Sequence, residues 1–127
     1  MLCSDTMVNM GITTVRLTVK NPAQPEKIFA ENFLVDSGAT YTIVPADILQ
    51  RLNIQPVREE TFSLADGRLV KRKVGNALFE FQGIESTAPV LFGEKDDSLL
   101  LGVLTLEAIG LTLDPLKRKL YKAHLRM

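Results

Sequence analysis

The sequence predicts a single, mainly β domain, built as a closed or partly closed barrel with two short helices. Three observations lead to this fold class. A chain of 127 residues suits one hydrophobic core. Most of its apolar runs are short and many alternate with polar residues, as in half-buried strands, and only two segments carry helix signals. With 46% hydrophobic and 24% charged residues, the composition is ordinary for a packed domain and excludes intrinsic disorder.

The amino-terminal part divides into a leader and two strands. Residues 1–10 show no periodicity and are interpreted as a loose leader, so the folded domain is expected to span residues 11–127. Apolar and polar residues alternate over 15–20, which predicts a first strand. A loop with two prolines, over 21–25, is expected to lead into a second strand over 27–35.

A short helix and a hairpin are predicted next. The helix covers 45–52, because proline suits the first helical position and its acidic and basic residues complement the helix dipole. Two β-rich segments, 57–64 and 69–74, flank Ala65-Asp66-Gly67-Arg68. Asp-Gly between strands is a strong hairpin signal, since glycine accepts a positive φ without steric cost.

The second half of the chain repeats these signals. Four strands and one helix are predicted there, in the order strand 76–82, strand 88–92, helix 103–109, strand 111–114 and strand 120–125. Gly75 and Gly83 are expected to bracket the first of these strands, and Gly110 to cap the helix. Both halves run from an apolar strand through a glycine-bearing turn to a short helix, which suggests an internal pseudo-duplication.

Charge and hydropathy exclude several classes of partner. Fifteen Lys and Arg balance fifteen Asp and Glu, which argues against nucleic acid as a partner. Basic clusters at 71–73 and 117–126 have no aromatic stripe beside them and are interpreted as solvated surface. The longest apolar run, 99–106, is too short to span a bilayer, so no membrane partner is expected.

Few residues suit metal or thiol chemistry. Cys3 is the only cysteine, which excludes an intrachain disulfide, and with no signal peptide visible we expect a cytoplasmic protein. His124 is the only histidine and is interpreted as a strand-edge residue. Glu94, Asp96 and Asp97 lack the remaining ligand positions of a calcium loop. No metal and no cofactor are therefore expected.

The segment Asp36-Ser37-Gly38-Ala39 carries the strongest chemical signal. Its carboxylate follows an apolar strand, where an unpaired buried charge would be costly. The small residues after it let backbone amides approach the carboxylate and leave space for a substrate. The structural alternative is an aspartate that caps its own turn.

Residues 33–45, which contain this segment, resemble the active-site signature of retropepsin-like aspartic proteases. The apolar residues and glycine over 99–102, followed by a short helix, resemble the second landmark of that family. The Asp66-Gly67 hairpin lies between the two landmarks, where the family places its flap. The resemblance extends over about residues 12–124. Its specificity comes from the order of the three landmarks, since Asp-Ser-Gly alone recurs in turns.

The sequence also departs from the retroviral branch of that family. Thr40 stands where retroviral enzymes usually carry an acidic residue, and Val103 stands where they carry an arginine. In the retroviral enzymes the acidic residue and the arginine normally pair with each other. Because this chain lacks both, neither charge is left without its partner. The chain therefore resembles a cellular or prokaryotic branch.

The resemblance implies a retropepsin-like acid-protease barrel with one lobe per chain, so that two copies must pair and contribute one Asp36 each. Such a homodimer is an aspartic endopeptidase, which hydrolyses a peptide or protein substrate with water activated by the paired carboxylates. Ser37 is expected to link the two active-site loops and Gly38 to contact the substrate backbone. The other implied site residues are Ala39 and Thr40 in substrate binding, Ala65, Asp66, Gly67 and Arg68 at the flap tip, and Gly102 as the glycine of the second motif.

Two other functions remain open at this point. The first is a catalytically silent, dimeric peptide-binding or scaffold module of the same fold, because fold alone does not fix function. The second is a monomeric β-barrel in which the Asp36 loop has no chemical role.

Overall fold

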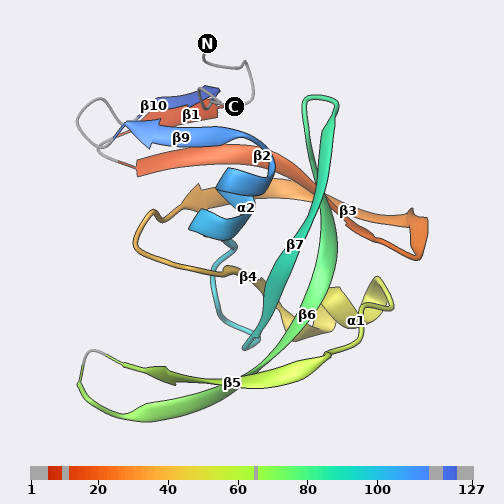
Figure 1. Ribbon diagram of the computed structural model, residues 1–127, viewed down its shortest axis with the longest axis vertical. Helices are drawn as coiled ribbons and strands as arrows, with labels where there is room; N and C mark the ends of the chain where they lie inside the picture. The colour runs from red at the N-terminus through yellow and green to blue at the C-terminus, as the bar shows by residue number, and fades with distance from the viewer. Residues whose placement is uncertain (1–5, 10–11, 65, 115–118, 123–127) are drawn as a thin grey trace, which may run out of the picture.

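The chain is mainly β with two short helices, as its sequence predicts (Figure 1). The computed structural model describes residues 6–9, 12–64, 66–114 and 119–122. Its strands are β1 (Thr6–Asn9), β2 (Ile12–Asn21), β3 (Gln24–Val35), β4 (Thr42–Pro45), β5 (Arg58–Ser63), β6 (Leu69–Phe81), β7 (Ile84–Gly93), β8 (Leu100–Leu101), β9 (Leu111–Asp114) and β10 (Lys119–Lys122). The helices are α1 (Ala46–Arg51) and α2 (Val103–Ala108).

Eight strands form one sheet in the order β1-β2-β3-β8-β4-β7-β6-β5, while β9 and β10 pair separately. A further pairing joins β2 to β6, so six strands pair in a ring that runs β2-β3-β8-β4-β7-β6 and returns to β2. The hairpin of β5 and β6 extends beyond this ring (Figure 1). The ring predicts that one face of each strand is buried, which the alternating burial along β2 bears out.

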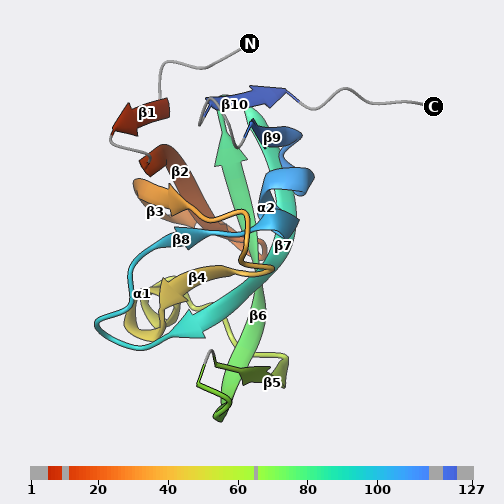
Figure 2. The ribbon, with the colours of Figure 1, turned by 90° about the vertical axis from the view of Figure 1, so that its left-hand side faces the viewer.

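The hydrophobic core draws on strands of the ring and on both helices. Its largest fully buried side chains are Phe33, Phe79, Leu17, Leu49, Leu101 and Ile109. Helix α2 packs beside β7 and α1 contacts β4 (Figure 2). Because β3 pairs with β8, and β4 pairs with β8 and β7, the loop that joins β3 to β4 starts and ends on paired strands.

The predicted loop over 21–25 is wrong, because β2 and β3 are joined by a two-residue turn. The side-chain oxygen of Asn21 accepts the backbone N–H of Ala23 at 2.8 Å, which closes the turn locally. The Asn21 amide also donates to the carbonyl oxygen of Leu52 at 2.8 Å and so ties the turn to the end of α1. Pro25 falls between the paired residues Gln24 and Ile28, so it removes no donor from the ladder.

The predicted strand break at Gly75 is also wrong, since β6 runs through it without interruption. A Cβ at this position would lie 2.9 Å from the carbonyl oxygen of Gln55 and 3.1 Å from the ring of Phe92. The glycine therefore permits close packing and does not end the strand. The β6–β7 ladder is longer than expected and closes at Gln82 and Gly83, whose positive φ values of 50° and 84° suit a tight hairpin turn.

The remaining elements differ little from expectation. Both helices lie within the predicted bounds to about one residue, and β9 has the predicted bounds. Strand β4 was not expected, and β1 pairs antiparallel with β2, so residues 6–9 of the expected loose leader form a strand. The domain boundary at residue 11 stays a prediction. Strand β10 begins one residue early, and the rest of that prediction, 123–125, lies outside the described residues.

Candidate active site

Asp36 is the first residue after β3, and its backbone is fixed from both sides. Its N–H donates to the carbonyl oxygen of Leu101 at 3.0 Å, while its own carbonyl accepts the N–H of Ala39 at 3.1 Å. Strands β3 and β8 lie parallel here, with Val35 beside Leu101. The two sequence motifs, 66 residues apart at Asp36 and Gly102, thus meet in space.

The Asp36 carboxylate is exposed and held by its own loop. One of its oxygens, Oδ1, accepts the backbone N–H of Gly38 at 2.9 Å. Asp36, Ser37 and Gly38 are all exposed in the single chain. A Cβ at residue 38 would lie 3.3 Å from Oδ1, a tighter contact than most real Cβ atoms make, so glycine keeps the carboxylate accessible from this side.

Gly102 and the start of α2 support the loop that follows Asp36. The N–H of Val103 donates to the carbonyl of Ala39 at 2.8 Å, and that of Leu104 to the carbonyl of Thr40 at 3.1 Å. A Cβ at residue 102 would lie 2.5 Å from the backbone carbonyl of Tyr41. Such a contact is impossible without moving the backbone, so this position requires glycine.

Two buried threonines complete the support, and sequence reasoning missed both. The hydroxyls of Thr42 and Thr105 lie 2.6 Å apart, and the N–H of Gly102 donates to the Thr42 hydroxyl at 3.0 Å. Both side chains are fully buried. For Thr42 the available signal was its place in β4 on the same buried face as Val44, which implies a buried partner; Thr105, on helix α2, gave no such signal.

A groove of about 420 Å³ lies between the active-site loop and the β5–β6 hairpin. It is lined by Gly38, Ala39, Thr40, Tyr41, Ile43, Phe62, Leu64, Val70, Arg72, Leu91 and Asp97. The predicted substrate-binding residues Gly38, Ala39 and Thr40 are thus brought together at its wall. Asp66, Gly67 and Arg68 are not part of this lining, and Ala65 lies outside the described residues.

The predicted Asp-Gly hairpin is confirmed at the tip of β5 and β6. Gly67 has a φ of 88°, and its N–H donates to the carbonyl of Leu64 at 2.9 Å. The Asp66 carboxylate accepts the backbone N–H of Arg68 at 3.0 Å and its guanidinium Nε at 2.7 Å. These two interactions, the backbone N–H first, hold the pKa of Asp66 below its ordinary value. The tip is therefore a closed, charged turn.

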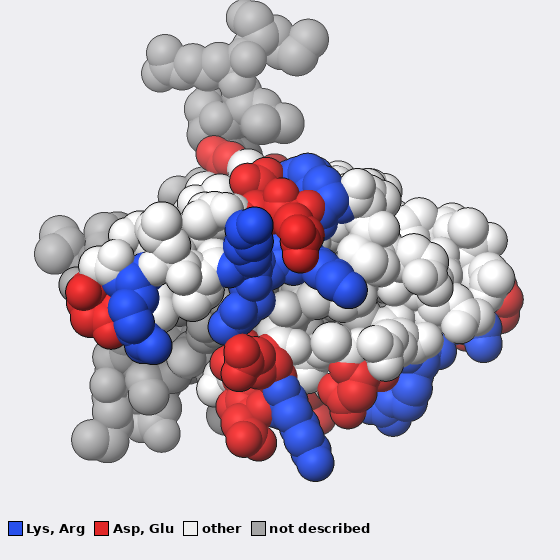
Figure 3. All heavy atoms as spheres, turned by 90° about the horizontal axis from the view of Figure 1, so that it is seen from below, with Lys and Arg blue, Asp and Glu red and all other residues white. Residues whose placement is uncertain are grey.

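The underside of the molecule shows acidic and basic side chains interspersed (Figure 3). Arg72, from the basic run 71–73, donates to the carboxylate of Glu94 at 2.9 Å. The backbone N–H of Glu94 in turn donates to the Asp97 carboxylate at 2.7 Å, which closes that loop. Within the described ranges, no group of three or more His, Cys, Asp or Glu is placed to hold a metal. Cys3 and His124 lie outside those ranges.

No helix in the described part of the chain is long and apolar enough to cross a membrane.

Comparisons with known proteins add the following. A family model described as the gag-polyprotein putative aspartyl protease matches residues 30–108, from within β3 to the end of α2. The solution structure of the simian foamy virus (mac) protease is similar to this chain, with a TM-score of 0.46 and 23% sequence identity. That similarity covers 74% of this chain and 90% of the viral one. A search of curated proteins gave no match.

Proposed function

The chain belongs to the gag-polyprotein aspartyl protease family. On the basis of this membership and of the site described above, we propose that it is an aspartic endopeptidase acting as a homodimer. Asp36 of each copy supplies one half of the catalytic pair. The observation that carries the proposal is the position and exposure of the Asp36 carboxylate. An exposed carboxylate stands directly after the buried end of β3, on a loop fixed by the second glycine motif, beside a groove of about 420 Å³.

The need for a second copy follows from the chemistry. One Asp-Ser-Gly occurs in the sequence, whereas the proposed reaction uses one carboxylate as a base and another as an acid. Asp36, Ser37 and Gly38 are exposed in the single chain, which leaves them free to face the same loop of a second copy across a two-fold axis. In this arrangement the Ser37 hydroxyl links the two loops and Gly38 contacts the substrate backbone.

Two such carboxylates share one proton, because like charges so close cannot both ionise. The ionised member takes a proton from a bound water as the water attacks the peptide carbonyl. The protonated member donates to the carbonyl oxygen, so the tetrahedral intermediate forms without a covalent bond to the enzyme. The Gly38 N–H, 2.9 Å from Oδ1, helps to orient the Asp36 carboxylate for both roles.

The proposed substrate is an extended peptide that binds along the groove. Backbone hydrogen bonds would hold it as an added strand, while the groove supplies side-chain contacts. Ile43, Phe62, Leu64, Val70 and Leu91 make much of this lining apolar. We therefore expect cleavage beside apolar side chains, with the flap tip at Asp66, Gly67 and Arg68 closing over the peptide.

The first test compares cleavage of an unfolded protein by the wild type, Asp36→Asn and Asp47→Asn between about pH 4 and 7, the range in which a coupled dyad can work. Asp47 is an exposed aspartate on α1, so its substitution is a matched control for the loss of one carboxylate. All three proteins are used at a concentration where sedimentation shows dimers. We expect the wild type and Asp47→Asn to cleave, Asp36→Asn to be inactive, and a statine-type transition-state mimic to block cleavage.

A wild-type dimer that binds unfolded peptide but leaves it intact would contradict the peptidase. That outcome would favour the silent peptide-binding module, in which Asp36→Asn leaves peptide binding unchanged. A protein that stays monomeric at all concentrations would contradict both dimeric functions.

A further inference from the structure

Tyr41, which the sequence did not single out, joins the active-site loop to the strand β5. It follows Asp36 on the same loop and is half-buried. Its hydroxyl accepts a hydrogen bond from the guanidinium Nη2 of Arg58 at 3.1 Å and donates to the carboxylate of Glu60 at 3.5 Å. Its ring meets that of Phe62 edge-on, with the ring centroids 5.8 Å apart at 86°.

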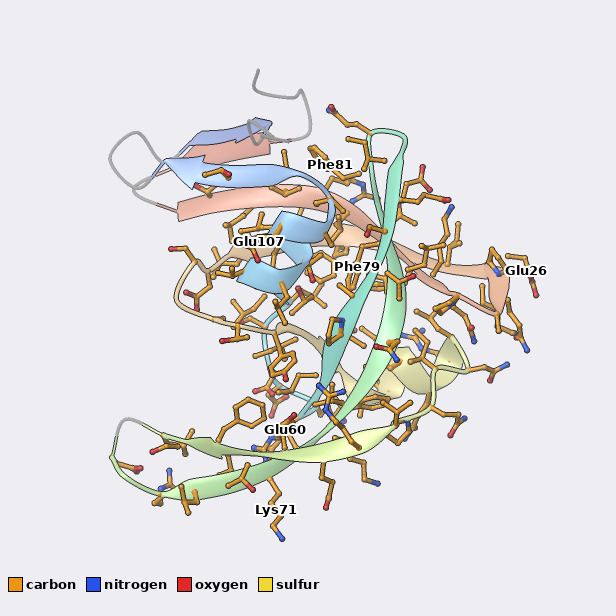
Figure 4. The ribbon with its side chains drawn as sticks, viewed as in Figure 1. Glu26, Glu60, Lys71, Phe79, Phe81 and Glu107 are labelled. Atoms are coloured by element: carbon orange, nitrogen blue, oxygen red, sulfur yellow. The ribbon has the colours of Figure 1, made fainter. Side chains whose placement is uncertain are left out.

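The three partners of Tyr41 share one face of β5. Arg58, Glu60 and Phe62 alternate along the strand, so their side chains project to the same side. Glu60 points from β5 toward the ring of strands, whereas Lys71 on the neighbouring strand β6 points away from it (Figure 4). One tyrosine therefore contacts three successive positions on the inner face of the hairpin.

The Arg58–Glu60 pair fixes the polar end of this cluster. The Nε of Arg58 donates to the same Glu60 oxygen that accepts the Tyr41 hydroxyl, at 2.9 Å. The guanidinium thus contacts Tyr41 and Glu60 at once, through two different nitrogens. Because the guanidinium is planar and rigid, this geometry restricts where β5 can lie relative to Tyr41.

Apart from the Arg72–Glu94 ion pair at 2.9 Å, which ties β6 to the loop after β7, few contacts in the described residues fix the hairpin over the active-site loop. Strand β5 pairs with β6 alone, and at its base the N–H of Val57 donates to the carbonyl of Val74 at 2.8 Å. Beyond this base, the separation of the hairpin from the active-site loop depends on side chains that reach across the groove. Tyr41 and Phe62 both do so, and both line the groove.

We propose that Tyr41, Arg58 and Glu60 form a latch that sets the separation of the β5–β6 hairpin from the active-site loop, and so the width of the groove. Tyr41 is then a positioning residue, which acts on the substrate through the hairpin. The effect of the latch on substrate binding rests on the proposed function, because it assumes that the groove is the substrate site. The effect of the latch on the position of the hairpin does not depend on catalysis.

The first measurement is amide hydrogen exchange of the substrate-free protein. Tyr41→Phe keeps the ring but removes the hydroxyl, so we expect exchange in the outer part of β5 and β6 to become about 3- to 10-fold faster, as for the loss of a hydrogen bond. Arg58→Gln is expected to act similarly. The double variant should exchange little faster than either single one, since both remove the same interaction. Exchange in β2 and β3 reports global stability and should not change.

Glu59 and Glu60 provide a matched pair within the same strand. They are adjacent, so their side chains project to opposite faces of β5. Glu60→Gln weakens the latch and should accelerate hairpin exchange about threefold or more, whereas Glu59→Gln makes the same chemical change on the outer face and should leave it unchanged. Equal effects of the two substitutions, or additive effects of Tyr41→Phe and Arg58→Gln, would overturn the latch.

Peptide kinetics separate the latch from the proposed activity. In a protein that cleaves peptides, Tyr41→Phe should raise KM about 3- to 10-fold and change kcat less than twofold, because the Asp36 loop keeps its own hydrogen bonds. Cleavage with unchanged KM and unchanged exchange would refute the latch and leave the peptidase standing. Faster hairpin exchange in a protein that cleaves nothing would support the latch and refute the peptidase.

Discussion

Substitution of Gly102 by alanine tests whether the second glycine motif holds the active-site loop in place. The added Cβ would lie 2.5 Å from the carbonyl carbon and oxygen of Tyr41 and 2.9 Å from the carbonyl oxygen of Thr40. All three atoms are backbone, so no side-chain rotation can relieve the contact. The loop or the start of α2 must move, which breaks the hydrogen bonds from Val103 and Leu104 to the loop carbonyls.

The cost can be estimated from these parts. Overpacking a tight site typically costs about 1–3 kcal/mol, and each of the weakened backbone hydrogen bonds contributes about 0.5–1.5 kcal/mol. We therefore expect Gly102→Ala to lower the free energy of unfolding by about 2–6 kcal/mol, a large share of the total for a typical domain. The change is measured by urea unfolding at a fixed protein concentration, so that any dimerisation contributes equally.

Gly93→Ala is the matched control, because this glycine is also buried. A Cβ there would lie 2.8 Å from the Ile43 side chain and 3.0 Å from the Asp97 carboxylate, and both side chains can shift. We expect a loss of about 1 kcal/mol. The reasoning would be refuted if Gly102→Ala stayed within about 1 kcal/mol of the wild type, or if both variants lost the same free energy.

Two further predictions concern the threonine pair and the hairpin tip. Thr42→Val should lower the free energy of unfolding, measured with urea, by about 1–3 kcal/mol. The loss should exceed that of Thr105→Val, because only the Thr42 hydroxyl also accepts the buried N–H of Gly102. Equal losses for the two variants would contradict this assignment. The pKa of Asp66 is lowered in the folded chain, so the stabilisation of the tip is present above the ordinary carboxylate pKa and is lost as pH falls through the lowered value. An NMR titration should place the midpoint of Asp66 below that of an aspartate in a short peptide. Arg68→Ala should raise this midpoint only part of the way to the peptide value, since the hydrogen bond from the backbone N–H remains. A midpoint that Arg68→Ala leaves unchanged would show that the guanidinium has no effect.

Local patterns predicted the elements whose causes are local. Strand β9, the two helices and the Asp66-Gly67 hairpin follow from alternation, end signals and the positive φ of glycine. Gly75 misled the prediction because its role is to admit the Gln55 carbonyl, a contact between segments about 20 residues apart. The inference that a glycine marks a turn is correct only where no distant backbone packs against the glycine.

The candidate site was predictable as far as its motifs were contiguous. Asp36 and Gly102 were found from their own neighbours, and the structure brings their segments together through the parallel pairing of β3 and β8. The proposed pseudo-duplication is not tested by this pairing and stays a prediction. Thr105 and Tyr41 were missed because their partners lie on other elements, 63 residues away for the Thr42–Thr105 pair. No local pattern reports such a contact.

The central claim is that two copies of Asp36 form one catalytic site, and mixed dimers test it most directly. Wild type and Asp36→Asn are unfolded together, refolded in varying ratios at constant total protein, and assayed for peptide cleavage after sedimentation confirms that dimers have formed. If each site needs both carboxylates, activity should fall with the square of the wild-type fraction, to about one quarter in an equal mixture. A linear decrease, to about one half in that mixture, would show that each chain acts alone and would contradict the account.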